Sequence, residues 1–283
     1  MHPQHISKLA LLLPSIGLGV ASCSLGGGPS LKGQASLMGQ PLQQATVSLW
    51  ESRGGEKPKQ LQTVRTDNNG SFQVSLKQEP GRVHYLISRG GRVNGMDADR
   101  LSMLTVLDGQ ASESVKVNEL TTVGSVWPNA QQLDGDLLQG SATALTIGSS
   151  QVKNLVNQGT GTFGETLLQG SNLLNSETAA RINVLSNLLA LCGNKKQTKA
   201  CDQLLTLTNS GDTLAAMTSI AREPWKNAKN LYQLFLKSYP IAPSTQLRAT
   251  ATKPYLLFEP KSFALSLRFE GGGALALGKV MLD

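Results

Sequence analysis

Histidine, cysteine and aromatic residues are scarce in this chain, and each scarcity restricts the chemistry that it can carry. The 283 residues include three His and three Cys, and aromatic residues make up 5% of the total. His2 and His5 lie in a segment that we expect to be removed, so His84 is the one histidine left for catalysis. A Ser–His–Asp triad would depend on this one residue. A zinc site needs about four ligands, and Cys192, Cys201 and His84 are three if Cys23 carries another group.

Charged residues and long apolar runs are also sparse. Charged residues are 16% of the chain and hydrophobic residues 40%, with a formal net charge of +7. This composition excludes a collagen, a wholly disordered chain and a polytopic membrane protein, yet it suffices to bury a core. Few aromatic residues are interleaved with the basic ones, so we expect no nucleic-acid partner.

The N-terminus has the pattern of an export signal. One cation, Lys8, precedes a mainly apolar run of 12 residues at 9–20, and the small residues Ala21 and Ser22 follow it. A membrane span needs about 20 apolar residues, so this run is too short to be one. The order of charge, apolar run and small residues predicts a secretory signal peptide over residues 1–22.

The residue after this signal is Cys23, and residues 20–23 (VASC) resemble the lipobox of bacterial lipoproteins. The resemblance implies a diacylglyceryl group on the Cys23 sulfur, cleavage before Cys23, and acylation of the new amine. Residues 23–30 then form a flexible tether, and membrane lipid is a partner through the acylated Cys23. The implied location is the cell envelope, at an outer membrane or the extracytoplasmic face of the cell membrane. An ordinary signal peptide with a chance Cys, or a core helix, is the alternative.

Residues 31–125 are expected to form an antiparallel β-sandwich. Apolar and polar residues alternate in short segments, which is typical of strands with one buried face. These segments are residues 45–49, 72–76, 83–87, 103–107 and 114–120. Residues 67–70 (DNNG) predict a hairpin turn, because Asn and Gly tolerate a positive φ. His84 alternates with Val83 and Tyr85, so we expect it to face outward.

Two motifs in this region carry a family resemblance. Residues 39–49 (GQPLQQATVSL) and 66–72 (TDNNGSF) resemble the carboxypeptidase regulatory-like, transthyretin-like β-sandwich module. The resemblance covers roughly residues 30–110, and the module is not itself a peptidase.

Residues 126–243 change to helical spacing and predict a small α-helical bundle. The expected helix starts are Ser176, Thr198, Asp212 or Thr213, and Pro224. We interpret the apolar stripe of the last helix, which includes Trp225 and Phe235, as core. The whole chain is therefore expected to be an α+β multidomain protein.

Two cysteines lie at the facing ends of two of these helices. Cys192 and Cys201 are separated by eight residues, and an exported protein meets an oxidising compartment. We predict a structural disulfide between them, with free buried thiols as the alternative. The intervening loop carries Lys195, Lys196 and Lys199, which are either a solvated face or a contact for anionic lipid or polysaccharide.

Residues 244–283 are expected to return to β-strands. Apolar and polar residues alternate over 263–269, and Gly271–Gly273 separate this segment from an apolar run at 274–282. Residues 118–123, 154–157, 160–162, 212–217 and 262–273 together resemble bacterial lipoproteins in which such a sandwich and a helical segment precede an NHL-type β-propeller. That propeller is often named by analogy with virginiamycin B lyase, and it would begin near the end of this chain.

Other motifs are weak matches to functional patterns. Residues 159–164 (GTGTFG) fit G-x-G-x-x-G but lack the buried strand before it that a dinucleotide site requires. Residues 273–279 (GALALGK) nearly match a phosphate-binding loop, but Val280 stands where Ser or Thr is needed. The Asp pairs at 97/99 and 134/136 do not continue as calcium loops, and we interpret them as turn or cap residues.

Together these patterns predict a lipid-anchored, non-catalytic envelope lipoprotein that presents a partner or a propeller and binds a protein or polysaccharide. We expect no enzyme activity, catalytic residue, metal or cofactor. The alternative is the N-terminal part of a β-propeller enzyme, lyase or hydrolase, whose active site lies beyond residue 283. A third possibility is a carbohydrate-binding sandwich.

Overall fold

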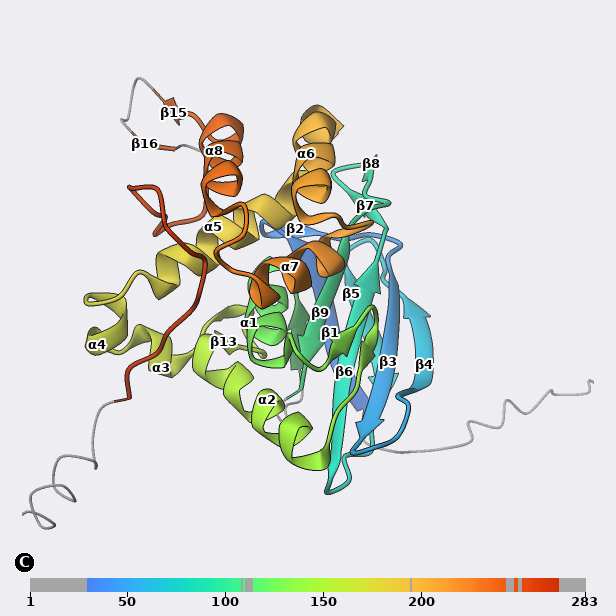
Figure 1. The fold of residues 1–283 in the computed structure, drawn as a ribbon. Coiled ribbons are helices and arrows are strands. Elements are labelled where there is room, and N and C mark those ends of the chain that lie inside the picture. The colour runs from blue at the N-terminus through green and yellow to red at the C-terminus, as the bar shows by residue number, and fades with distance from the viewer. Residues whose placement is uncertain are drawn as a thin grey trace, which may run out of the picture.

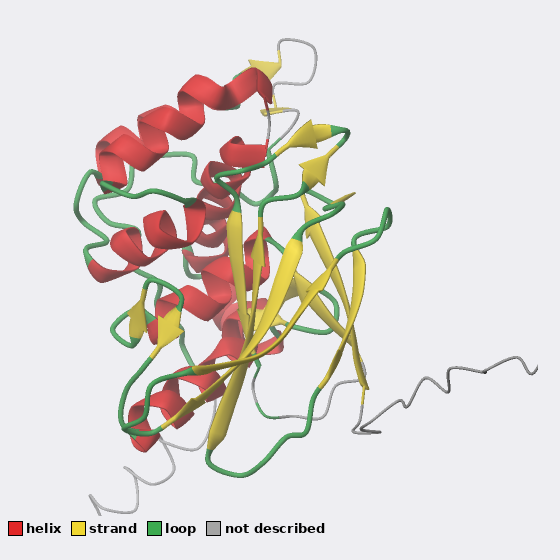
Figure 2. Cartoon of the chain, turned by 90° about the vertical axis from the view of Figure 1, so that its right-hand side faces the viewer, coloured by secondary structure: helices red, strands yellow, loops and turns green. Residues whose placement is uncertain are grey.

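The computed structural model describes residues 30–107, 109, 114–193, 195–242, 247–248 and 251–269. Over this part the protein is a mixed α+β structure, in which most helices lie to one side of the main strands (Figures 1 and 2). Cys23, the expected signal peptide and the expected strand at 274–282 lie outside the described residues, and so does the expected tether apart from Ser30.

One four-stranded antiparallel sheet has the strand order β4–β3–β6–β9. Its strands are β3 (Thr46–Arg53), β4 (Lys59–Arg65), β6 (Arg82–Arg89) and β9 (Ser102–Val106). Val47 and Leu49 of β3 are buried, as the alternation predicts. Strand β6 lies between β3 and β9, and all its residues from 83 to 88 are buried. The prediction that His84 faces outward is therefore wrong, because both faces of this strand are covered.

The second sheet is built around β1 (Ser30–Leu37). Strands β5 (Ser71–Ser75) and β2 (Gln40–Pro41) pair with β1 in the antiparallel sense, whereas β10 (Ser114–Val117) pairs with it in parallel. The expectation of a purely antiparallel arrangement is wrong at this pair. A parallel pair requires a long crossover, and here the crossover contains the whole β4–β3–β6–β9 sheet.

Residues 66–70 form a turn, but it is not the expected hairpin. Asp67 Oδ1 accepts hydrogen bonds of 2.8 Å from the backbone N–H groups of Asn69 and Ser71. This Asx-type bonding bends the chain locally, as the residue types predict. The strands that the turn joins, β4 and β5, pair with β3 and β1 respectively and so belong to different sheets. A turn motif specifies the bend, whereas burial decides which strand is the partner.

Short strand pairs connect the larger elements. They are β7 (Arg92–Val93) with β8 (Met96–Asp97), β11 (Leu133–Asp134) with β12 (Leu137–Leu138), β13 (Val156–Asn157) with β14 (Thr162–Phe163), and β15 (Ile241–Ala242) with β16 (Leu247–Arg248). The G-x-G-x-x-G segment, residues 159–164, includes the turn of the β13–β14 pair and does not follow a buried strand.

The described residues contain eight α-helices and two short 3₁₀ helices. They are α1 (Glu119–Asn129), α2 (Ala142–Leu155), α3 (Glu165–Leu168), α4 (Gly170–Leu173), α5 (Thr178–Ala190), η1 (Leu191–Gly193), η2 (Lys195–Gln197), α6 (Thr198–Thr208), α7 (Thr213–Arg222) and α8 (Ala228–Ser238). Of the two expected starts of α7, Asp212 is the cap, because its carboxylate accepts a hydrogen bond of 2.9 Å from the Ala215 N–H. Thr198 is the first residue of α6 and not its cap.

The last of these helices differs most from expectation. Helix α8 begins at Ala228, because Asn227 before it adopts a left-handed backbone with φ of 55°. Pro224 therefore lies ahead of the helix, and Trp225 is 66% exposed. Trp225 is not part of the core as expected, whereas Phe235 is buried.

Helix α1 covers the open edge of strand β9. Asn118 begins the helix with a capping box. Thr122 Oγ1 accepts a hydrogen bond of 3.1 Å from the Leu104 N–H, and Ser125 Oγ accepts one of 2.9 Å from the Val106 N–H. These hydroxyls accept hydrogen bonds from the N–H groups of the edge strand, as the carbonyls of a neighbouring strand would. Strand β10 accordingly ends at Val117, earlier than the predicted strand at 114–120.

One buried apolar cluster extends through both sheets and the helices. The expected domain boundary between residues 125 and 126 falls inside α1, which packs against β9 as well as against α2, α5 and α7. The sheets and helices therefore share a core and do not separate at that position. No helix within the described ranges is both long and apolar enough to cross a membrane.

Residues 263–269 carry the expected alternation but are not part of a sheet among the described residues. The Asn172 side chain donates to the Arg268 carbonyl and accepts from the Arg268 N–H, both at 2.7 Å. Thr178 Oγ1 makes the same pair of contacts with Ser266, at 2.6 and 3.3 Å. The bonds fall on alternate residues, which is the pattern of an extended chain. Side chains of the helical region thus take the place of the expected partner strand.

Candidate functional site

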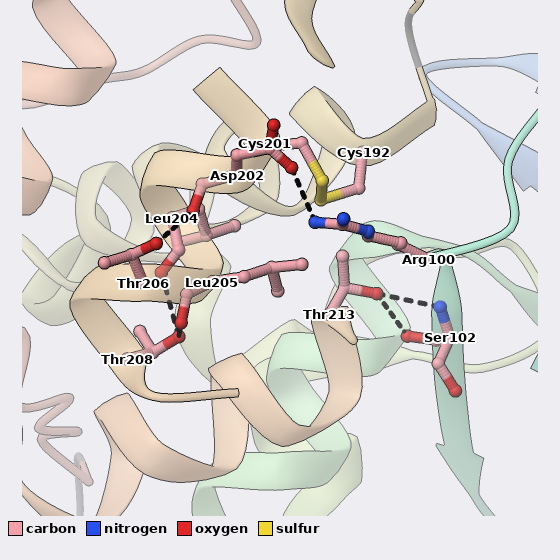
Figure 3. Close-up of a disulfide and its surroundings, with 10 residues drawn as sticks. All are labelled: Arg100, Ser102, Cys192, Cys201, Asp202, Leu204, Leu205, Thr206, Thr208 and Thr213. Carbon is pink, nitrogen blue, oxygen red and sulfur yellow. Dashed lines mark hydrogen bonds and ion pairs between the residues drawn. A yellow bond between two sulfur atoms is a disulfide. The ribbon is translucent and has the colours of Figure 1, made fainter. Parts of the chain in front are cut away.

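A pair of bonded cysteines joins the end of one long helix to the beginning of the next. The sulfur atoms of Cys192, in η1, and Cys201, in α6, are 1.99 Å apart, with Cα atoms separated by 4.8 Å (Figure 3). Both side chains are buried. The structure thus brings together the two cysteines of the predicted disulfide and closes the lysine-bearing loop between them.

The neighbourhood of the disulfide is tied to strand β9. Arg100 Nη1 lies 2.6 Å from Asp202 Oδ1, one residue beyond Cys201 (Figure 3). Thr213 Oγ1 accepts from the Ser102 N–H at 2.8 Å and donates to the Ser102 carbonyl at 2.7 Å. Arg100 and Asp202 are both about half exposed, so their ion pair adds little stability, whereas the buried Thr213 bonds anchor α7 to the sheet.

A cavity of about 510 Å³ opens beside this loop. It lies between the β1–β2 turn, the β7–β8 turn, the end of α5 and the η1–η2 loop, and Tyr239 after α8 closes one side. The apolar part of its lining comes mainly from Leu37, Val93, Met96 and Ala190. Lys196 contributes a cationic group to the lining.

Two tight hairpin turns border this cavity, and both require left-handed backbones. Met38 and Gly39 join the paired residues of β1 and β2, with φ of 49° and 75°. Asn94 and Gly95 do the same between β7 and β8, with φ of 50° and 74°. Asn–Gly is the preferred pair for such a turn, but a left-handed Met costs roughly 1–2 kcal/mol. Met38 is therefore the strained residue of the site.

A buried carboxylate holds Met38 in this conformation. Glu119 Oε2, at the beginning of α1, accepts a hydrogen bond of 3.1 Å from the Met38 N–H. Burial raises the pKa of Glu119, although this bond and its own backbone N–H oppose the shift. Burial also raises the pKa of Tyr239, with the charge of Glu119 as a smaller cause. The Tyr239 hydroxyl donates to the Asn187 carbonyl at 2.8 Å, which fixes its ring against the cavity.

A second hollow, of about 370 Å³, contains the buried His84. His84 Nε2 lies 3.4 Å from Glu51 Oε2, and burial lowers the pKa of His84 more than this carboxylate raises it. Arg82 bonds to Glu51 at 2.8 Å and to Glu79 at 2.6 Å. No hydroxyl or thiol of the described residues hydrogen-bonds to His84 Nε2, so this group lacks the bonded nucleophile of a triad.

One residue of each Asp pair forms an ion pair. Asp136 pairs with Arg89, which also reaches Asp212 at 3.0 Å, and Asp97 pairs with Arg92 at 3.3 Å. Within the described part of the chain, no group of His, Cys, Asp and Glu side chains could hold a metal ion. Residues 273–279 lie outside the described residues.

The sequence patterns pointed to Lys196 but missed Met38, Glu119 and Tyr239. A Met–Gly pair between alternating segments was the available signal, since Met is unusual where a hairpin turn favours Asn or Gly. Glu119 gave no signal, because an acid in the first turn of a helix is ordinarily a surface residue that favours the helix dipole.

No family model matches the chain, and no curated protein matches it significantly. Among solved structures, the chain is similar to a 9R-lipoxygenase from Cyanothece at 12% identity and a TM-score of 0.22. The match covers 64% of this chain and 26% of the lipoxygenase chain. A score this low supports no inference about fold or activity.

Proposed function

We propose that the protein is a lipid-anchored, non-catalytic binding module of the bacterial cell envelope. The observation that carries this proposal is the pairing of the cysteines. Cys192 and Cys201 lie at bonding distance from each other, so the third cysteine of the chain, Cys23, is left to receive a lipid. A disulfide also fits the oxidising compartment to which a signal peptide leads.

The position of the lipobox suits an anchor. Cys23 stands seven residues ahead of Ser30, where β1 begins, and Gly-Gly-Gly-Pro lies between them. Such a segment is a short tether that keeps the folded part close to the membrane surface. One acyl chain binds a bilayer only marginally, so the two or three chains of a bacterial lipoprotein are what would make the attachment stable.

We infer that the two larger sheets correspond to the transthyretin-like sandwich of the family resemblance, and α5 to α8 to its helical segment. The shared buried cluster of the sheets supports the first assignment, and the mutual packing of these helices supports the second. In this proposal the binding function belongs to the cavity beside the disulfide loop, where the two parts meet.

Detergent phase partitioning of protein made in a bacterial host tests the anchor. We expect the wild type to enter the detergent phase, and mass spectrometry to find an N-terminal peptide that begins with an acylated Cys23. Cys23→Ala should stay in the aqueous phase, whereas the matched variant Ser24→Ala should behave as the wild type. A wild-type protein in the aqueous phase, with an intact leader and a free thiol at Cys23, would overturn the proposal.

A further inference from the structure

The cavity beside the disulfide loop has the size and lining of a site for a small amphipathic molecule. Its volume of about 510 Å³ falls within the roughly 300–1,000 Å³ that is typical of ligand pockets. Leu37, Val93 and Ala190 provide rigid apolar contacts, and Met96 adds an adaptable thioether. Gln40, Asn94 and Gln197 add amide groups to the lining, so a molecule with both an apolar chain and a polar head group fits it.

The charge of the rim selects one class of head group. Lys196 lines the cavity, and the exposed Lys199 follows in the first turn of α6. The loop over residues 191–197 contains no acidic residue, so the charges that it contributes to this side of the cavity are positive. A cationic group beside an apolar cavity is complementary to an anion at the end of an apolar chain.

The strained turn points to the same site. Gly or Asn would occupy the Met38 position without the left-handed cost, yet the chain has Met there and holds it with the buried Glu119. Strained residues concentrate where the side chain serves a ligand. Met38 lines the cavity, and its sulfur accepts a hydrogen bond of 3.7 Å from the Thr252 hydroxyl.

From this geometry we propose that the cavity binds a single-chain fatty acid, with the hydrocarbon against Met38 and Met96 and the carboxylate at Lys196. The inference rests on the proposed binding role, but not on the lipid anchor. A phospholipid surface offers the same acyl and anionic chemistry, and the test separates the two sources.

Displacement of the fluorescent fatty acid 11-(dansylamino)undecanoic acid from the full-length protein provides the test. We expect dodecanoate to displace the probe, and uncharged dodecan-1-ol of equal chain length to do so more weakly. Lys196→Gln should weaken dodecanoate binding about three- to tenfold, the range for a partly solvated charge-assisted contact, and leave dodecan-1-ol unchanged. Lys199→Gln, in the first turn of α6 and outside the lining, is the matched control.

Met38→Gly separates the ligand contact from the fold. Glycine relieves the left-handed backbone but removes the packing of Met38 against the core, so the two effects oppose each other and the variant should unfold close to the wild-type temperature. It should nonetheless bind dodecanoate at least about threefold more weakly, because it removes apolar contacts with the chain. Equal binding by this variant would overturn the role of Met38.

Three outcomes would overturn the proposal itself. They are no displacement by dodecanoate, equal displacement by the acid and the alcohol in wild type, and binding to phosphatidylglycerol vesicles without binding to monomeric dodecanoate. Repeating the titration with Cys23→Ala separates this test from that of the anchor. Dodecanoate binding that persists in a protein without lipid would support the cavity even if the anchor proposal failed.

Discussion

Removal of the Cys192–Cys201 link is the perturbation whose effect is best defined by the structure. The two residues are nine apart in sequence, and their bond closes a loop of about ten residues. In the chain-entropy model, closing such a loop lowers the entropy of the unfolded chain by an amount that stabilises the fold by about 2.7 kcal/mol. The double variant Cys192→Ala/Cys201→Ala should lose this amount, and somewhat more from the truncation of two buried sulfurs.

Thermal unfolding followed by circular dichroism measures this loss. For a protein of this size, 1 kcal/mol corresponds to about 2–4 °C in Tm, so the double variant should unfold roughly 5–11 °C lower. Wild type treated with a reducing agent should shift in the same direction. Asp202→Ala is the matched control, because it removes only the exposed ion pair with Arg100 and should cost less than about 1 kcal/mol.

The same variant tests the connection to the cavity. Gly193 and Lys196 belong to the closed loop and line the cavity, so opening the loop should weaken dodecanoate binding as well. The stabilising role of the disulfide would be refuted by two results together. They are free thiols at Cys192 and Cys201 in the native wild type, and a Tm that a reducing agent leaves unchanged.

Three further predictions follow from buried groups. Burial raises the pKa of Glu119 above 4.5, so the stability of the wild type relative to Glu119→Gln should decrease as the pH rises from about 4.5 through the raised pKa. Urea unfolding of both proteins between about pH 4 and pH 8 measures this difference. A difference that does not change with pH would contradict the prediction. Asn172→Ala should lower the free energy of unfolding by about 1–2 kcal/mol, because the hydrogen bonds to the Arg268 carbonyl and N–H are lost. Trypsin should also cleave after Arg268 faster than in the wild type. Cleavage at the wild-type rate would argue against this contact. Phe263 is buried, so Phe263→Ala should lower the free energy of chemical unfolding by about 3–5 kcal/mol. Phe269 is 65% exposed, so Phe269→Ala should change it by less than about 0.5 kcal/mol. Equal losses of stability in the two variants would show that the segment is packed differently.

Local patterns predicted the elements well wherever one neighbourhood decides the structure. The alternating segments around Val47, Phe72 and Met103 became β3, β5 and β9. Asp212 caps α7 as predicted, because a cap needs only the backbone of the next turn. Helical spacing also placed Phe235 in the core, but Trp225 lies outside it because a left-handed residue intervenes.

The candidate site could be predicted only in part. The lysine loop was visible, since Lys196 and its neighbours are a local charge pattern. The cavity was not, because it joins residues from β1, β7, α5, η2 and the segment after α8. No local pattern indicates that Glu119 is buried under Met38, 81 positions away in the sequence.

The amino-acid sequence alone determined the alternation of β3 and β5, the cap of α7 and the bend at residues 67–70, because each depends on neighbouring residues. Only the tertiary structure decided that the residue 67 turn crosses between sheets, that His84 is buried, and that residues 263–269 bind side chains instead of a strand. Those outcomes depend on which distant surfaces exclude water together, and short-range residue preferences do not encode that choice.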